Sequence, residues 1–272
     1  MTTRRIFIAY GIVLALLAAG WLMIRPSNDR NWAKDQQILS RAEINGNLIT
    51  VRNIRNFTYE STSSYSPSYY DKMFDLTKLV RVWYVVEPFA SFPGAAHTFL
   101  SFEFEDDEFL AISVEIRKEQ GELFSPLKGL LKRYELMYVA GDERDLIKLR
   151  SNYRKDDVYV YPARASKAAV QELLLSMVAR MNAVGKNPEF YNTLTNTCMT
   201  NIVAHINEIA PERVPIAPEI LLPAESDRLA FELGLIDTDL SFAEARAYFH
   251  INDRAAKYAD SPNFSRKIRE HE

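Results

Sequence analysis

The stretch that decides the fold is AHTFLSFEFEDDEFLAISVEIR, residues 96–117. Two runs rich in β-branched and aromatic residues, 96–104 and 109–117, lie on either side of the acidic residues 105–108. Strands of this composition that are separated by a few polar residues are typical of a β-hairpin. The sequence therefore predicts that the two runs pair as antiparallel neighbours.

The length of the hairpin turn decides which side chains share a face. With a three-residue turn at 105–107, Phe104 faces Glu108 and His97 faces Glu115, with Cβ atoms about 5 Å apart in such pairs. With a turn of two or four residues the register shifts by one, and Glu115 moves to the other face. The sequence leaves both registers open.

The rest of the chain supplies strands first and helices afterwards. Further strands are predicted at 48–59, 79–89, 133–140 and 158–161. Helices are predicted at 28–42, 142–149, 166–184, 195–210, 225–233 and 241–258. Residues 61–70 are predicted to form a loop, and the residues after 260 a charged, frayed tail. This order predicts an α+β fold in which a mainly antiparallel sheet packs on helices.

The N-terminus predicts a membrane anchor. Arg4 and Arg5 precede an uncharged apolar run at 6–24, and a helix needs about 20 apolar residues to cross a bilayer. The two arginines favour a cytoplasmic N-terminus, so we expect one transmembrane helix in the cell inner membrane and a domain in the periplasm. A signal peptide that is cleaved after residues 18–20 is the alternative, and it exports the domain as well.

The composition fits one globular domain behind that anchor. Hydrophobic residues make up 47% and charged residues 25% of the 272-residue chain, so a packed core is expected. The formal charge of −3 offers no broad basic field, and nucleic acid is therefore not an expected partner. The predicted organisation is a signal anchor at 1–28, one domain with a C-terminal helical part at 29–260, and the charged tail at 261–272.

Several common catalytic and ligand-binding motifs are absent from the sequence. Gly-x-Ser-x-Gly, Gly-x-Gly-x-x-Gly, a phosphate-binding loop ending in Gly-Lys-Ser/Thr, His-Glu-x-x-His and Cys-x-x-Cys do not occur. We therefore expect no metal and no cofactor. The single cysteine, Cys198, cannot form an internal disulfide.

Cys198 is the candidate nucleophile, because it falls in the first turn of a predicted helix, where free N–H groups and the helix dipole stabilise a thiolate. The thiol needs a base. His205 lies on the same helix, roughly 10 Å further along its axis, while His250 is on a late helix and His271 is in the tail. His97 opens a strand behind small residues, and a cysteine at a helix N-terminus facing such a histidine is the papain-like arrangement.

Glu115 is the candidate that orients the imidazole, provided that the hairpin turn has three residues. Each of the three candidates also has a plainer interpretation, as a buried cysteine, a strand histidine and a solvated glutamate. Arginines on the first strand and after the hairpin suit phosphate or carboxylate recognition, with surface ion pairs as the alternative. The substrate-binding candidates there are Arg52, Asn53, Arg55 and Arg117.

At these residues the sequence resembles the Lnb N-terminal periplasmic domain family, which is related to circularly permuted papain-like thiol enzymes of the NlpC type. The resemblance covers roughly Trp32 to Ala256. It rests on five blocks: VRNIRNF (51–57), AHTFLSF (96–102), SVEIR (113–117), YEL (134–136) with DERD (142–145), and FYNTLTNTC (190–198).

The resemblance implies a papain-like fold and a Cys-His enzyme. In the permuted members the histidine precedes the cysteine, as His97 precedes Cys198. Cys198 would accept an acyl group as a thioester and pass it to an amine or to water, with His97 as the base and Glu115 as its orienting partner. Tyr191 and Asn196, in the block that leads to Cys198, are further substrate-binding candidates.

The chain departs from the family pattern beside the cysteine, where Thr197 and Met199 stand in place of Asn and Thr. The expected function is a membrane-anchored periplasmic thiol enzyme for acyl transfer or for hydrolysis of acyl or amide bonds, on a lipid, lipoprotein or peptide. A cell-wall amidase or peptidase and a non-catalytic periplasmic binding module are the alternatives. The first expectation requires an apolar channel at Cys198, the second an open polar cleft, and the third an isolated thiol.

Overall fold

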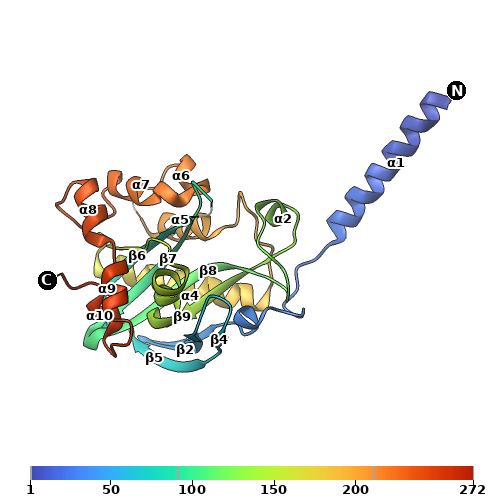
Figure 1. Ribbon diagram of the computed structural model, residues 1–272. Coiled ribbons are helices and arrows are strands. Elements are labelled where there is room, and N and C mark those ends of the chain that lie inside the picture. The colour runs from blue at the N-terminus through green and yellow to red at the C-terminus, as the bar shows by residue number, and fades with distance from the viewer. Residues whose placement is uncertain (1, 91, 211, 272) are drawn as a thin grey trace.

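The computed structural model describes residues 2–90, 92–210 and 212–271, with the backbone alone for residues 2–4. It is a mixed α+β structure in which one sheet is covered by helices and α1 extends away from the domain (Figure 1). The strands of the eight-stranded sheet are β1 (Arg41–Asn45), β2 (Leu48–Arg55), β5 (Tyr69–Asp75), β6 (Leu79–Pro88), β7 (Ala96–Phe104), β8 (Glu108–Arg117), β9 (Glu135–Gly141) and β10 (Tyr159–Pro162).

Helices occupy both ends of the chain and most of its C-terminal half. They are α1 (Thr2–Met23), α2 (Pro126–Leu130), α3 (Glu143–Lys148), α4 (Lys167–Lys186), α5 (Cys198–Ile209), α6 (Pro218–Leu221), α7 (Ser226–Glu232), α8 (Phe242–Phe249), α9 (Asn252–Lys257) and α10 (Phe264–Lys267). A π-helical turn at Leu149–Arg154 follows α3. The prediction of an α+β fold is confirmed.

The sheet runs in the order β1-β2-β9-β8-β7-β6-β10, with β5 paired to the other side of β2. All its neighbours are antiparallel except β2 and β9, which meet in parallel through one residue pair. A second, two-stranded sheet joins β3 (Thr58–Tyr59) to β4 (Tyr65–Ser66). The sheet is therefore mainly antiparallel, as its composition predicts.

The central hairpin has the three-residue turn. Residues Glu105–Asp107 form the turn between β7 and β8, and Phe104 pairs with Glu108. Asp106 and Asp107 both have positive φ, which short acidic side chains tolerate better than most. The register then continues as far as Phe99 opposite Ser113.

The two strands part beyond that pair. β7 stays with β6 as far as Ala96, whereas β8 stays with β9 as far as Arg117. The ladder between β7 and β8 therefore ends while each strand remains held by its other neighbour. The result is a gap within the sheet, bordered by residues 96–98 on one side and 114–116 on the other.

The two faces of the sheet are covered by different helices. Even-numbered residues of β7, such as Leu100 and Phe102, belong to the core that includes α4 and α5, and we call this side the α5 face. Phe99 belongs to a second core with Leu146 of α3 and Phe264 of α10, and we call this side the α3 face. Successive strand residues alternate between the two faces.

Four segments differ from the sequence-based prediction, each because a tertiary contact prevails over local preference. Residues 28–42 form a short 3-10 turn and the start of β1 instead of a helix, since Trp32 lies 4.1 Å under the Arg117 guanidinium and Gln36 is buried. Residues 61–70 form a small hairpin and the start of β5 instead of a loop. The helix predicted at 241–258 breaks at His250, because Ile251 donates its N–H to the Val158 carbonyl (3.0 Å).

The fourth difference is the C-terminal segment, for which the sequence predicts a frayed tail. Phe264 and Ile268 are fully buried in the core of the α3 face. The Arg269 guanidinium is paired with the buried carboxylate of Glu143. The segment is therefore a docked part of the domain.

Helix α1 is separate from this core. Its span Arg5–Met23 is long and apolar enough to cross a membrane, and none of it is buried within the domain. This finding agrees with the predicted N-terminal anchor.

We expect Phe264→Ala to lower the free energy of unfolding by about 3–5 kcal/mol, because it empties a fully buried aromatic site. Urea unfolding of the full chain in detergent, followed by tryptophan fluorescence, measures the change. Phe92→Ala is the matched control, since Phe92 is 50% exposed, and its effect should stay within about 0.5 kcal/mol. Equal effects of the two substitutions would mean that the C-terminal segment is frayed after all.

Candidate active site

Cys198 is the first residue of α5. The turn before it is fixed by a capping box, in which Thr197 and Thr200 each bond to the other's backbone N–H. Burial raises the pKa of the Cys198 thiol, while the N–H and hydroxyl of Thr98 and the N–H of Met199 lower it by stabilising the thiolate. The thiol is thus half-buried and neutral at rest, with several donors aimed at the sulfur.

His97 lies in the second position of β7 and points to the α3 face. Its ring stacks on that of Phe99, with centroids 5.7 Å apart, and the residue that pairs with it on β6 is Glu87. Its side chain is only 11% exposed. Thr98, the next residue, points to the α5 face, where its hydroxyl lies 3.8 Å from the Met199 sulfur.

Ser113 joins His97 to Glu115. The Ser113 hydroxyl donates to Glu115 Oε1 (2.9 Å), and His97 Nε2 lies 2.7 Å from the same hydroxyl oxygen. Because a serine has a single O–H, its oxygen accepts the bond from His97, so His97 carries its proton on Nε2. His97 Nδ1 is then the unprotonated nitrogen.

Glu115 therefore acts on His97 mainly through Ser113. Glu115 Oε1 is 3.9 Å from His97 Nε2, which is beyond hydrogen-bonding distance. The same carboxylate receives a bond from Arg150 (3.2 Å) and faces Arg55 at 4.0 Å. Burial opposes ionisation of Glu115, but these two guanidinium groups outweigh it and hold its pKa well below the usual range.

The same surroundings keep His97 neutral. Burial and the charge of Arg150, which the carboxylate of Glu115 offsets only in part, lower the pKa of His97 to about 3. Arg150 is itself held by Glu87, with Nε and Oε2 2.7 Å apart. An imidazolium is therefore disfavoured at neutral pH, and so is a preformed thiolate–imidazolium ion pair.

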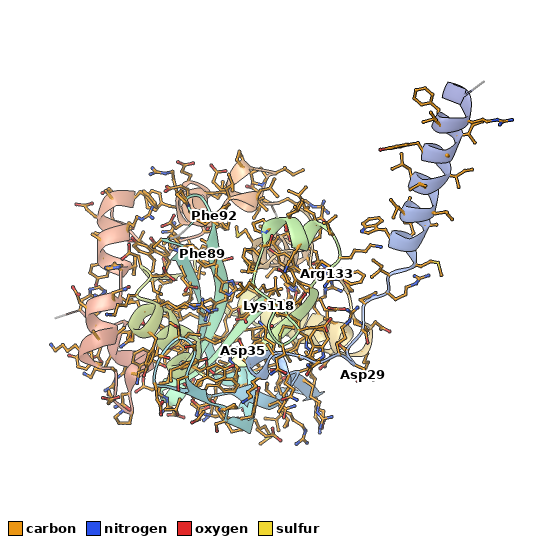
Figure 2. All side chains as sticks on the ribbon, turned by 45° about the vertical axis from the view of Figure 1, so that its right-hand side comes forward. Asp29, Asp35, Phe89, Phe92, Lys118 and Arg133 are labelled. Carbon is orange, nitrogen blue, oxygen red and sulfur yellow. The ribbon has the colours of Figure 1, made fainter. Side chains whose placement is uncertain are left out.

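Cys198 and His97 line one pocket, of about 250 Å³, at the gap between β7 and β8. Its walls come from both faces of the sheet, with Cys198 and Tyr191 on one side and His97, Glu115, Arg55 and Arg150 on the other. Figure 2 labels three further wall residues, Asp35, Phe89 and Lys118, which come from three separate segments of the chain. Residues from both faces of the sheet therefore border one common space at this gap.

The thiol and the imidazole do not touch in this arrangement. Within residues 2–90, 92–210 and 212–271, no hydrogen bond links Cys198 with His97, and the strand residue that contacts the thiol is Thr98. Catalytic hydrogen bonds are often long before substrate binds. Cys198 and His97 share a pocket, but their catalytic pairing stays a prediction, which a measurement of the reaction has to test.

Of the substrate-binding candidates, the pocket contains Arg55 and Tyr191. Arg55 is held by both oxygens of Asp145, each at 3.0 Å. Burial raises the pKa of Tyr191, and the neighbouring Cys198 adds to this, so its phenol stays protonated.

The other four candidates lie elsewhere. Arg52 pairs with Glu43 and Asp71 on the outside of the sheet, and Asn53 closes the bulge beside it. Arg117 donates to the carbonyls of residues 36 and 37 and so holds the N-terminal linker. Asn196 bonds to the Phe190 carbonyl and to Asn201, and so shapes the loop before α5.

Sequence reasoning missed Ser113 and Arg150. Ser113 could have been found once the hairpin register was assumed, because it lies two residues before Glu115 and shares its face. No local signal marks Arg150, which reaches the site from a π-helical turn. Among the described residues, no group of three or more His, Cys, Asp or Glu side chains could hold a metal ion.

Comparison with known proteins gives one match. The family model described as the Lnb N-terminal periplasmic domain covers residues 65–224, more than half of the chain. This stretch contains four of the five quoted sequence blocks and the three candidate catalytic residues, whereas VRNIRNF at 51–57 lies outside it. No curated protein and no solved structure matches the chain.

We expect NMR of the histidine ring nitrogens to find His97 as the neutral Nε2–H tautomer between about pH 5 and pH 8, since its pKa lies near 3. Ordinary histidine titrates near 6.5, so the contrast is large. Ser113→Ala removes the acceptor of the Nε2 proton and should populate the Nδ1–H tautomer as well. A His97 titration near 6.5, or a tautomer indifferent to Ser113, would contradict the hydrogen-bond assignment. His97→Gln identifies the signal.

Proposed function

Because the chain belongs to the Lnb N-terminal periplasmic domain family, we propose that it is a membrane-anchored periplasmic thiol enzyme that transfers or hydrolyses acyl groups through a thioester on Cys198. The resemblance predicted from the sequence is confirmed for residues 65–224. The family is periplasmic and α1 can cross a membrane, so the protein is a membrane-associated periplasmic protein. Its residence in the inner membrane and its chemistry are parts of the proposal.

The observation that carries the proposal is the common pocket of Cys198 and His97 at the gap in the sheet. A nucleophile and a base that approach from opposite sides of a gap can meet on a substrate placed within it. The neutral Nδ1 of His97 is the free base, and its tautomer is fixed by Ser113 and Glu115. Such an orienting chain has the role that the third residue plays in a catalytic triad.

The reaction proceeds in two balanced steps. His97 Nδ1 takes the Cys198 proton as the sulfur attacks the acyl carbonyl carbon; a C–S bond forms, and the leaving alcohol or amine departs with the proton from His97. An amine or water then attacks the thioester carbonyl carbon and gives its proton to His97. A C–N or C–O bond forms, the C–S bond breaks, and the departing Cys198 thiolate takes the proton from His97. Since both partners begin neutral, His97 acts as a general base during attack.

Donors around the sulfur suit the oxyanion of the tetrahedral intermediate. The N–H groups of Thr98 and Met199 already stabilise negative charge at Cys198. The protonated phenol of Tyr191 lines the same pocket as Cys198. In a site that excludes water, such preorganised donors are worth several kcal/mol to the transition state, about 3 kcal/mol for one of them.

A second cavity favours an acyl substrate over a peptide. It has a volume of about 340 Å³ and lies on the α5 face between α5 and α7. Its lining is almost entirely apolar and includes Tyr84, Leu100, Met199, Ile202, Ile206 and Leu229. Met199, the residue after Cys198, lines this cavity, whereas the pocket of Cys198 and His97 has a separate lining, so the proposal requires the acyl chain to pass Met199. A hydrocarbon chain gains about 0.8 kcal/mol for each methylene buried there.

The rival functions have weaker support. The polar lining of the pocket of Cys198 and His97 favours an amidase or peptidase. Against it, Arg55 and Arg150 are already engaged with Asp145, Glu115 and Glu87, and the apolar cavity would have no part in binding a peptide. A non-catalytic binding module is favoured by one observation, the lack of a hydrogen bond between Cys198 and His97 within the described residues. Covalent trapping of an acyl group on Cys198 distinguishes an enzyme from a binding module.

We expect the full chain in detergent to acquire an acyl group from a fluorescent diacyl phospholipid or a diacylated lipopeptide. The label should sit on Cys198, as mass spectrometry of peptides can show, and neutral hydroxylamine should remove it as it removes thioesters. Cys198→Ala should abolish labelling, and His97→Ala should slow it by about 10²–10⁴-fold, the usual contribution of a general base. A thiol that neither donor labels would leave the binding module as the function.

We also expect Ala230→Phe to discriminate between donors by chain length. Ala230 lines the apolar cavity from α7, and a phenyl ring there excludes part of the chain. Loss of even two methylenes costs about 1.6 kcal/mol, so labelling by a long-chain donor should fall roughly tenfold or more, while an acetyl thioester donor is unaffected. Ala168→Phe, at an exposed position of α4, is the control. An equal loss with both donors would mean that the cavity does not hold the chain.

A further inference from the structure

An exposed apolar patch surrounds α2. Four of its residues lie in or beside that helix and a fifth in the loop that contacts it. They are Leu123 (80% exposed), Phe124 (48%), Leu127 (64%), Leu131 (48%) and Leu194 (52%), and we call them the α2 patch. Thr193, next to Leu194, donates to the Pro126 carbonyl (2.7 Å), which joins the two parts. Neighbouring exposed apolar side chains of this kind mark a surface that binds a membrane or another molecule.

Basic side chains are interleaved with the patch. Lys128 is exposed on α2, and Arg133, which pairs with Glu122 (3.5 Å), is 60% exposed just after it. Lys132 lies between them, with its ammonium group 4.2 Å from the ring centroid of Trp21 at the end of α1. Apolar residues mixed with lysine and arginine are the composition of segments that lie in the headgroup region of anionic membranes.

The chain between α1 and the domain is short enough to keep this surface close to the bilayer. α1 ends at Met23, and the domain already holds residue 27, whose N–H donates to Glu135 (3.2 Å). Asn28 donates to the Gly185 carbonyl (2.8 Å), and Arg30 pairs with Glu135 (3.0 Å). Only three residues are left between them, which span about 10 Å at most.

Figure 1 places α2 on the side of the domain from which α1 leaves, and Figure 2 shows Arg133 on that side as well. We propose that the α2 patch docks on the lipid surface from which α1 emerges, with its leucines in the headgroup and upper acyl region. The patch holds the domain in one orientation, in addition to the tether that α1 supplies.

The docking has a consequence for the pocket. Phe124 belongs both to the α2 patch and to the wall of the pocket of Cys198 and His97. The docked orientation therefore presents that pocket to the lipid surface. This consequence rests on the proposed function, but the docking itself does not, because it depends only on exposure, charge and the length of the linker.

A nitroxide spin label tests the docking. Cys198 is the only cysteine, so Leu127→Cys in a Cys198→Ser background carries one label on the full chain. The protein is reconstituted in vesicles with equal parts of phosphatidylethanolamine and phosphatidylglycerol. Power saturation then compares collisions of the label with oxygen, which concentrates in lipid, and with a water-soluble nickel chelate. Leu240→Cys is the control, because Leu240 is 36% exposed and lies two residues before α8, which Figure 1 shows on the side of the domain away from α1.

We expect the label at 127 to be several-fold less accessible to the nickel chelate than the label at 240, and more accessible to oxygen. Adding Leu123→Asp and Leu131→Asp should return the label at 127 to the aqueous profile. Equal nickel accessibility at 127 and 240, or no response to the two aspartates, would overturn the docking. Because no turnover is measured, this outcome is independent of whether Cys198 is a nucleophile.

Discussion

The divergence of β7 from β8 is the constraint on which the candidate site depends. Each strand remains hydrogen-bonded to its outer neighbour after the ladder between them has ended at Phe99 and Ser113. A continuous sheet would separate a thiol on one face from an imidazole on the other by a layer of backbone. The gap removes that layer, so a helix N-terminus on the α5 face and a strand side chain on the α3 face border the same space.

Buried charges on the α3 face hold the gap in place. Arg55 is paired with Asp145, Arg150 lies between Glu87 and Glu115, and all of these groups are largely removed from water. A buried ion pair often adds little net stability, whereas removal of one partner leaves an uncompensated charge that costs several kcal/mol. The network therefore acts more on geometry and on proton affinity than on stability. Burial, together with the charge of Arg150, keeps His97 neutral beside an ionised carboxylate.

The sequence predicts the hairpin, the long helix at α4 and the position of Cys198 in the first turn of α5, because each depends on local pattern and capping. It could not choose the hairpin register, since one residue of turn length moves every side chain to the other face. The contribution of Arg150 depends on how a π-helical turn packs against β8, for which no local pattern exists. The segments at 28–42 and after 260 were mispredicted because contacts with distant residues, Arg117 and Glu143, decide their conformation.

The three-residue link between α1 and the domain also determines how such a protein would encounter its substrates. A domain held within about 10 Å of the bilayer searches in two dimensions by lateral diffusion, and molecules free in the surrounding solution meet it only at that surface. Encounter rates then scale with the surface density of a lipid-borne substrate, as with effective concentration in any tethered pair. A longer link would give the domain access to a larger volume and lower its effective concentration at the bilayer. The length of residues 24–26 therefore limits how far from the bilayer the domain can act.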